Sequence, residues 1–153
     1  MASRFVYVTY IRTTPTKLWD ALTKPEFTRQ YWFGVTLDCD WPVGSPWKMV
    51  FADGTISDTG EILEVEPKKR LVIKWRNEFP EMKPEGFTRC VFDLAQEGDT
   101  MRLTVTHEID LNKSKTIEAV SNGWPKVLSG LKTLLETGST LAIAHRTSTR
   151  KTA

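Results

Sequence analysis

The sequence contains few cysteines and histidines and lacks long hydrophobic runs. Its 153 residues include two cysteines and two histidines. Cys39 and Cys90 have no CxxC spacing and are too few for a disulfide framework, so we expect both to be reduced in a cytoplasmic protein. Apolar runs extend to four residues, as in 5–8, against the roughly 20 needed to span a bilayer. With no secretory pattern at the start either, we expect no membrane insertion.

The common catalytic and metal-binding motifs are also absent. There is no GxSxG or HExxH pattern and no glycine-rich phosphate loop. His107 and His145 lie far apart, and the calcium-loop-like start Asp38-Cys39-Asp40 has Pro42 where an oxygen ligand belongs. We therefore predict no catalytic residue, no metal and no cofactor. Cofactor-free proton transfer or cyclisation has no such motif and remains an alternative.

The charge is small and unevenly placed. The formal net charge is +2, and Arg146, Arg150 and Lys151 lie in the last segment without an acid. The remainder is nearly neutral, so a nucleic-acid partner is not expected. We expect one domain over residues 1–138 and a flexible basic tail over residues 139–153.

Hydrophobic periodicity predicts an α+β domain. Residues 5–12 have strand character, and Thr14-Pro15 is a typical helix start for a short helix ending near Thr23. A second short helix is expected to end near Tyr31. Turn residues then recur about every ten positions between residues 35 and 109, which favours about six antiparallel strands. In the last of these, Met101 to Asp110, apolar and polar residues alternate, so we expect one buried face.

A long amphipathic helix is expected from about Ser114 to Thr137, with Gly138 as its C-terminal cap. Its apolar stripe comprises Ile117, Val120, Trp124, Val127, Leu128, Leu131, Leu134 and Leu135. Pro125 is unfavourable inside a helix, so a kink or break is expected near Asn122-Gly123.

Several segments together resemble the START-like (SRPBCC) superfamily, and within it the group named after the activator of the heat-shock protein 90 ATPase. They are TTPTKLWDALTKPEFTRQYW, DWPVGSPWKM, RLVIKW, MRLTVTH and GWPKVLSGLKTLLE. The resemblance covers residues 4–138. Ser45 replaces the second glycine of the usual double-glycine turn, and Pro125 departs from the family pattern.

The resemblance implies a helix-grip fold, in which a curved antiparallel sheet of about six or seven strands wraps around the long C-terminal helix. Two short helices follow the first strand. Members of the superfamily bind hydrophobic ligands, cyclise polyketides or bind protein partners, and a shared fold does not select among these. The eukaryotic activators also carry a further chaperone-binding domain and an N-terminal motif. Because this sequence enters the first strand almost at once, we expect chaperone activation less than ligand binding.

Two groups of residues have alternative interpretations. His107 is expected on a buried face, either as a polar anchor or general base at a cavity wall, or as a core histidine bonded to a neighbour. Trp75 and Trp124 are equally compatible with a ligand pocket and with simple core filling.

The leading hypothesis is a hydrophobic or aromatic small molecule held between the long helix and the sheet. A protein-binding module related to stress-response co-chaperones and a cofactor-free cyclase-like enzyme are the alternatives. The candidate ligand-binding residues are Trp32, Trp47, Trp75, Phe92, Leu103, Val105, His107, Trp124, Leu128 and Leu131.

Overall fold

The computed structural model describes residues 2–141, which form seven strands, three α-helices and one short 3-10 helix. In chain order the elements are β1 (Ser3–Ile11), α1 (Pro15–Thr23), α2 (Pro25–Tyr31), β2 (Thr36–Cys39), β3 (Pro46–Val50), β4 (Ile56–Glu66), β5 (Arg70–Asn77), η1 (Lys83–Glu85), β6 (Thr88–Glu97), β7 (Thr100–Ile109) and α3 (Lys115–Thr137).

Local capping explains where the helices begin and end. Thr14 Oγ1 accepts a hydrogen bond from the Lys17 N–H at 3.2 Å, and Pro15 occupies the first position of α1. Ser114 caps α3 in the same way, accepting from the Ile117 N–H at 3.0 Å. Gly138 ends α3 with a φ of 90°, a left-handed conformation that favours glycine. These caps confirm the expected helix boundaries.

All seven strands form one antiparallel sheet in the order β1-β7-β6-β5-β4-β3-β2. Strands that follow one another in the chain are neighbours in the sheet, with one exception. β1 pairs with β7, the last strand, and not with β2. The alternation expected for β7 is confirmed, because every second residue from Met101 to Ile109 is buried. The buried face of this strand includes His107, which lies opposite Phe5 of β1 and Cys90 of β6.

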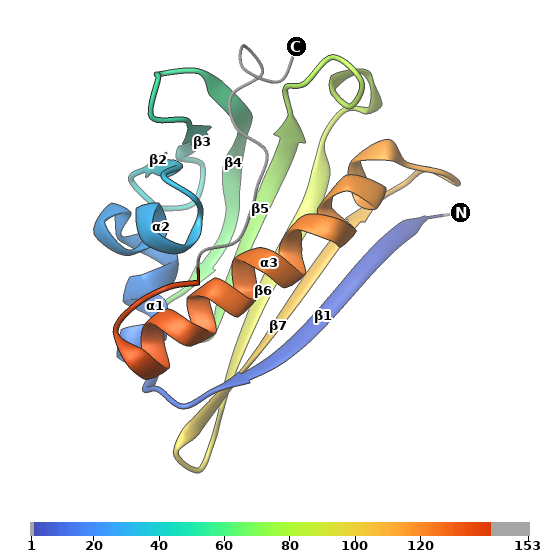
Figure 1. Cartoon of the computed structure of the whole chain (residues 1–153). Coiled ribbons are helices and arrows are strands. Elements are labelled where there is room, and N and C mark those ends of the chain that lie inside the picture. The colour runs from blue at the N-terminus through green and yellow to red at the C-terminus, as the bar shows by residue number, and fades with distance from the viewer. Residues whose placement is uncertain (1, 142–153) are drawn as a thin grey trace.

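The long helix α3 crosses one face of the curved sheet, while α1 and α2 lie beside β2 and β3 (Figure 1). The core fills the space between these layers, and Leu128 and Leu131 of α3 are almost fully buried in it. This arrangement confirms the predicted α+β architecture of a curved sheet wrapped around a long C-terminal helix.

Two expectations at the C-terminal end have different outcomes. The break expected near Asn122-Gly123 is not found, because α3 is continuous from Lys115 to Thr137 with Pro125 inside it. Trp124 and Val127, on either side of the proline, are both buried, so packing offsets the single hydrogen bond that proline cannot donate. Most of the expected basic tail, residues 142–153, lies outside the described residues.

Glycine is required at one position of β4. An ideal Cβ built on Gly60 lies 1.7 Å from the carbonyl oxygen of Lys74 in β5, far inside van der Waals contact. By contrast, a Cβ on Gly123 in α3 meets no atom within 4 Å. These two glycines therefore form a matched pair for substitution by alanine.

We expect Gly60→Ala to lower the free energy of unfolding by about 3 kcal/mol or more, because β4 and β5 must separate to admit the methyl group. Gly123→Ala should leave stability unchanged or raise it by up to about 1 kcal/mol, since alanine is the better helix former. Chemical denaturation of both variants measures the difference. Equal stability of Gly60→Ala and the wild type would contradict this close packing.

Candidate functional site

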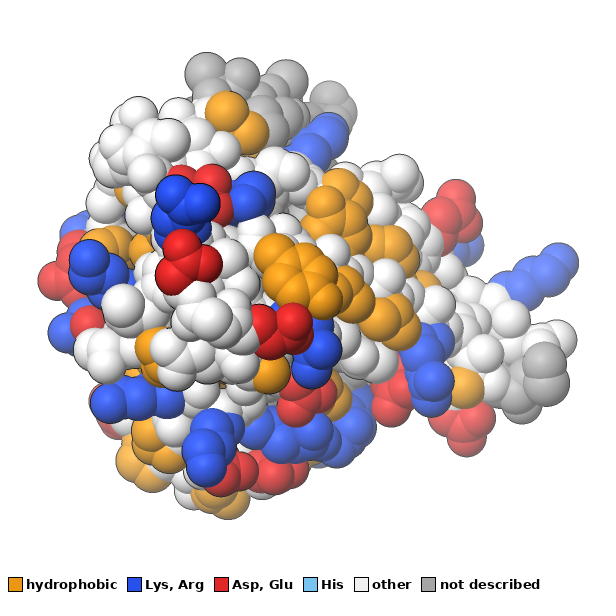
Figure 2. Space-filling view, turned by 90° about the horizontal axis from the view of Figure 1, so that it is seen from below, with side chains coloured by type: hydrophobic (Ala, Val, Ile, Leu, Met, Phe, Trp, Pro, Cys, Tyr) orange, Lys and Arg blue, Asp and Glu red, His pale blue; other side chains and the backbone are white. Residues whose placement is uncertain are grey.

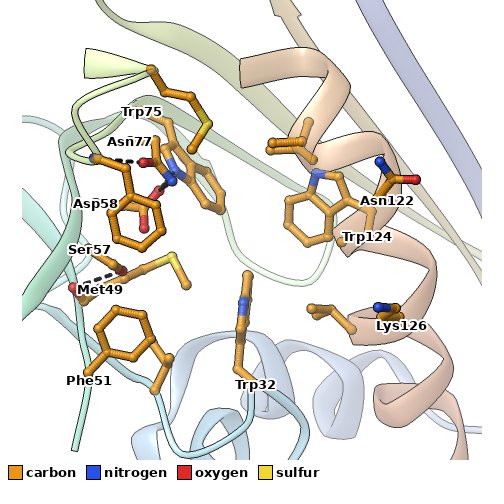
Figure 3. A pocket seen from close by; sticks show the side chains of 17 residues that line it. Trp32, Met49, Phe51, Ser57, Asp58, Trp75, Asn77, Asn122, Trp124 and Lys126 are labelled. Atoms are coloured by element: carbon orange, nitrogen blue, oxygen red, sulfur yellow. Dashed lines mark hydrogen bonds between the residues drawn. The ribbon is translucent and has the colours of Figure 1, made fainter. Parts of the chain in front are cut away.

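A pocket with a volume of about 280 Å³ lies between α3 and one end of the sheet. Asp58 and Trp75 face it from the strands, Trp124 and Lys126 face it from α3, and Trp32 lies between these two walls (Figure 3). The remaining lining residues are Val35, Met49, Phe51, Ser57, Asn77, Phe79, Met82, Ala119, Val120, Asn122, Gly123 and Val127. The lining is thus mainly apolar and aromatic, with few polar groups, as is usual for sites that bind small molecules.

Strand β4 contains a bulge at Ser57, in the part of the strand that lines the pocket. Met49 of β3 pairs with Asp58 and Val50 pairs with Ile56, so Ser57 is an extra residue without a partner in β3. Ser57 and Asp58 are consecutive and yet both are buried, which a regular strand with alternating faces does not produce. Bulges commonly redirect side chains beside functional sites.

Asp58 is a buried carboxylate whose side-chain hydrogen-bond donors are neutral. Its Oδ2 accepts a hydrogen bond from the Trp75 indole N–H at 2.6 Å and a longer one from the Asn77 amide at 3.3 Å. Burial raises the pKa of Asp58 from 3.8 to about 6, and nearby Glu78 adds to this rise while the hydrogen bonds oppose it. At neutral pH the carboxyl is therefore still mainly ionised.

A chain of hydrogen bonds connects the two pocket walls beneath the pocket. The Trp124 indole N–H donates to His107 Nδ1 at 3.1 Å, and His107 Nε2 lies 2.7 Å from Thr88 Oγ1. The Thr88 hydroxyl donates to the Trp75 carbonyl oxygen at 2.7 Å. Because Nδ1 accepts a hydrogen bond and the Thr88 hydroxyl already donates its hydrogen to Trp75, His107 is neutral with its proton on Nε2. Burial lowers its pKa from 6.5 to about 3, consistent with this state.

The tryptophans pack on one another around this chain. The ring centroids of Trp32 and Trp124 are 5.4 Å apart, and those of Trp75 and Trp124 are 5.7 Å apart. The ring centroids of Trp47 and Trp75 are 4.4 Å apart. Edge-to-face and tilted arrangements of this kind fix ring orientation, so the aromatic wall of the pocket is held in a defined position.

The loop between β5 and β6 closes another side of the pocket with Phe79 and Met82, both buried. Its two ends are anchored by acidic residues. Glu78 pairs with Arg76 at 2.6 Å, and Glu85 accepts hydrogen bonds from Ser114 and from the first backbone N–H groups of α3. Burial would raise the pKa of Glu85, but these hydrogen bonds outweigh it and the pKa is lowered.

Three of the ten residues proposed from the sequence line the pocket, namely Trp32, Trp75 and Trp124. The others lie in the core outside its wall: Trp47, Phe92, Leu103, Val105, His107, Leu128 and Leu131. His107 corresponds to the core interpretation, because both ring nitrogens have protein partners and the ring does not face the pocket. Within residues 2–141, no group of three or more His, Cys, Asp or Glu side chains is placed to hold a metal ion.

Sequence reasoning missed the strand and loop residues of the site. Phe79 and Met82 had a signal, since apolar residues beside Pro80 in a polar loop indicate packing against a core. Ser57 had none, because the bulge that buries it depends on the pairing of β4 with β3, and the same pairing sets Asp58 opposite the buried Met49.

On the face seen from below, neither positive nor negative side chains dominate (Figure 2). Lys and Arg side chains alternate there with Asp and Glu, around a band of hydrophobic side chains (Figure 2). No helix among the described residues is both long and apolar enough to cross a membrane.

A curved antiparallel sheet gripping a long C-terminal helix over an apolar pocket defines a helix-grip protein of the START-like class. The family model described as "Activator of Hsp90 ATPase homolog 1-like protein" matches residues 12–136, and the chain therefore belongs to this family. Among curated proteins, none matches the sequence.

Solved structures with the same fold come from several organisms. A protein from Mesorhizobium loti is 24% identical with a TM-score of 0.74, covering 87% of this chain and 96% of its own. An HSP90 activator from Plasmodium falciparum is 20% identical with a TM-score of 0.71, covering 86% and 95%. The Aha1 dimer from Colwellia psychrerythraea is 22% identical with a TM-score of 0.71, covering 89% and 98%. These similarities show the fold.

Two substitutions at His107 test the hydrogen-bond chain. His107→Leu leaves the Trp124 N–H and Thr88 without this partner, whereas His107→Gln can offer an oxygen to one and an N–H to the other. We expect His107→Leu to be about 2 kcal/mol less stable than His107→Gln at pH 7.

The shifted pKa of His107 also predicts how the stability of the protein depends on pH. The pKa of His107 is lower in the folded than in the unfolded state, so its contribution to stability is complete above pH 6.5 and is lost as the pH falls toward 3. Denaturation measured between pH 7 and pH 4 should show a decrease in the free energy of unfolding of the wild type that both variants lack. An identical pH profile for all three proteins would contradict a neutral, buried His107.

Proposed function

We propose that this protein binds a small hydrophobic or aromatic molecule in the pocket between α3 and the sheet, as a cytoplasmic carrier or sensor. The observation that carries the proposal is the pocket itself: an apolar, aromatic cavity of about 280 Å³ with a small number of polar groups. This volume lies near the lower end of the range for ligand pockets, which favours ligands of one or two rings.

The fixed orientation of the wall supports the same proposal. His107 and Thr88 link the Trp124 indole of α3 to the backbone of Trp75 in β5, and the Trp75 indole donates to Asp58, so both rings are positioned without a ligand. Preorganisation of this kind reduces the ordering cost of binding. Catalysis by His107, as in the cyclase-like alternative, has less support because its ring nitrogens are engaged and it lies outside the pocket lining.

A protein-binding function is the second candidate, and one observation favours it. Val6, Val8 and Tyr10 are 49%, 48% and 48% exposed on the outer face of the edge strand β1. Exposed apolar side chains in a row are suited to a partner surface. The family name and the similarity to a Plasmodium falciparum HSP90 activator suggest a chaperone as that partner.

Pocket occupancy is tested by titrating the protein with a set of fatty acids, flavonoids and other aromatic compounds, observed through the NMR signals of the tryptophan indoles. We expect binders to shift the Trp75 and Trp124 signals. Ala119→Trp, at an exposed position that lines the pocket, should abolish these shifts because the new ring fills the space. Glu118→Trp, on the neighbouring exposed position outside the pocket, is the matched control. Absence of any shift in the wild type would overturn the proposal.

The second candidate is tested with the bacterial homologue of the heat-shock protein 90 chaperone. We expect the wild type not to stimulate its ATPase activity. Stimulation that the double variant Val6→Thr/Tyr10→Thr loses, and that Ala119→Trp retains, would favour the protein-binding function over ligand binding.

A further inference from the structure

Asp58 is the only acidic residue among those that line the pocket, and Lys126 is the only basic one. The two differ in their surroundings. Asp58 is 6% exposed on the strand wall, whereas Lys126 is exposed on α3 across the pocket. The buried end of the pocket therefore carries a negative charge, and the positive charge lies in contact with water.

The Asp58 charge has no cationic partner among residues 2–141. The ion pairs that Lys and Arg side chains form in this part of the chain are with other acids and not with Asp58. The nearest acid, Glu78, is paired with Arg76 and Lys83, so neither of these cations is free to neutralise Asp58. Its hydrogen bonds come from the neutral groups of Ser57, Trp75 and Asn77. Buried charges in proteins are ordinarily paired, because an isolated one is costly to desolvate.

The aromatic lining is suited to the missing cation. Trp75 donates its edge N–H to Asp58, and its ring also contacts Trp32 and Trp124, so the carboxylate lies at the border of a cluster of indoles. Tryptophan faces attract ammonium groups by cation–π interaction, and most strongly where water is excluded. A neutral ligand would bury the Asp58 charge further without compensation, and an anionic ligand would add repulsion.

We propose that the ligand of this pocket is a hydrophobic organic amine, whose ammonium group pairs with Asp58 while its apolar part packs against Trp32, Trp75 and Trp124. This inference rests on the proposed ligand-binding function and names the chemical class of the ligand. The register of β4 on β3 then provides the specificity, since Asp58 pairs with the buried Met49 and so lies on the inner face of the sheet, in a mainly apolar pocket.

The experiment compares three probes of similar shape: 2-naphthylmethylamine, 2-naphthylmethanol and 2-naphthoate. Binding to the wild type, Asp58→Asn and Lys126→Gln is measured at pH 7.5 by calorimetry and tryptophan fluorescence. We expect the amine to bind the wild type at least about tenfold more tightly than the alcohol. Asp58→Asn should remove this preference and leave the alcohol nearly unaffected, while Lys126→Gln should not weaken the amine.

Each contrary outcome overturns the inference in a distinguishable way. Equal affinities for amine and alcohol, unchanged in Asp58→Asn, would overturn the amine preference and leave the proposed function standing. Tightest binding of the naphthoate, lost in Lys126→Gln, would make the lysine the anchor and the ligand an anion. Failure of all three probes to bind, with no indole shifts in the wider compound set, would overturn the inference and the proposed function together.

Discussion

The buried hydrogen-bond chain from Trp124 through His107 and Thr88 to Trp75 is the constraint on which the site depends. It joins the long helix to the sheet inside the core. Hydrogen bonds are directional, so they define positions that apolar packing alone defines less strictly. Each polar atom in it has a partner, so a histidine can be buried at little cost. The chain fixes the indole of Trp124 and holds the backbone of Trp75, and both residues line the pocket.

Asp58 differs from His107, because it is buried as a charged group. Where His107 is neutral and saturated, Asp58 carries a charge that only neutral donors approach, and burial raises its pKa to about 6. A folded chain that keeps such a group forgoes some stability, because a well-packed apolar residue would cost less. Buried charged groups of this kind commonly serve binding or catalysis. The carboxylate of Asp58 therefore supports a binding role for the pocket.

Local patterns in the sequence predicted most of the fold and part of the site. The alternation along β7 placed His107 on the buried face, and the helical stripe identified Trp124, because both periodicities are properties of a single element. Asp58 was missed, since its own segment does not show that β4 pairs with β3 and sets Asp58 opposite the buried Met49. The break expected near Asn122-Gly123 was wrong because packing of Trp124 and Val127 against the core outweighs the one hydrogen bond that Pro125 cannot donate.

Native mass spectrometry of the full chain, incubated with a mixture of one- and two-ring hydrophobic compounds, tests the central claim most directly. The account predicts a noncovalent complex with one ligand per wild-type chain, and only the bare chain for Ala119→Trp under the same conditions. No complex with the wild type, or the same complex with both proteins, would contradict the assignment of this pocket as a ligand-binding site.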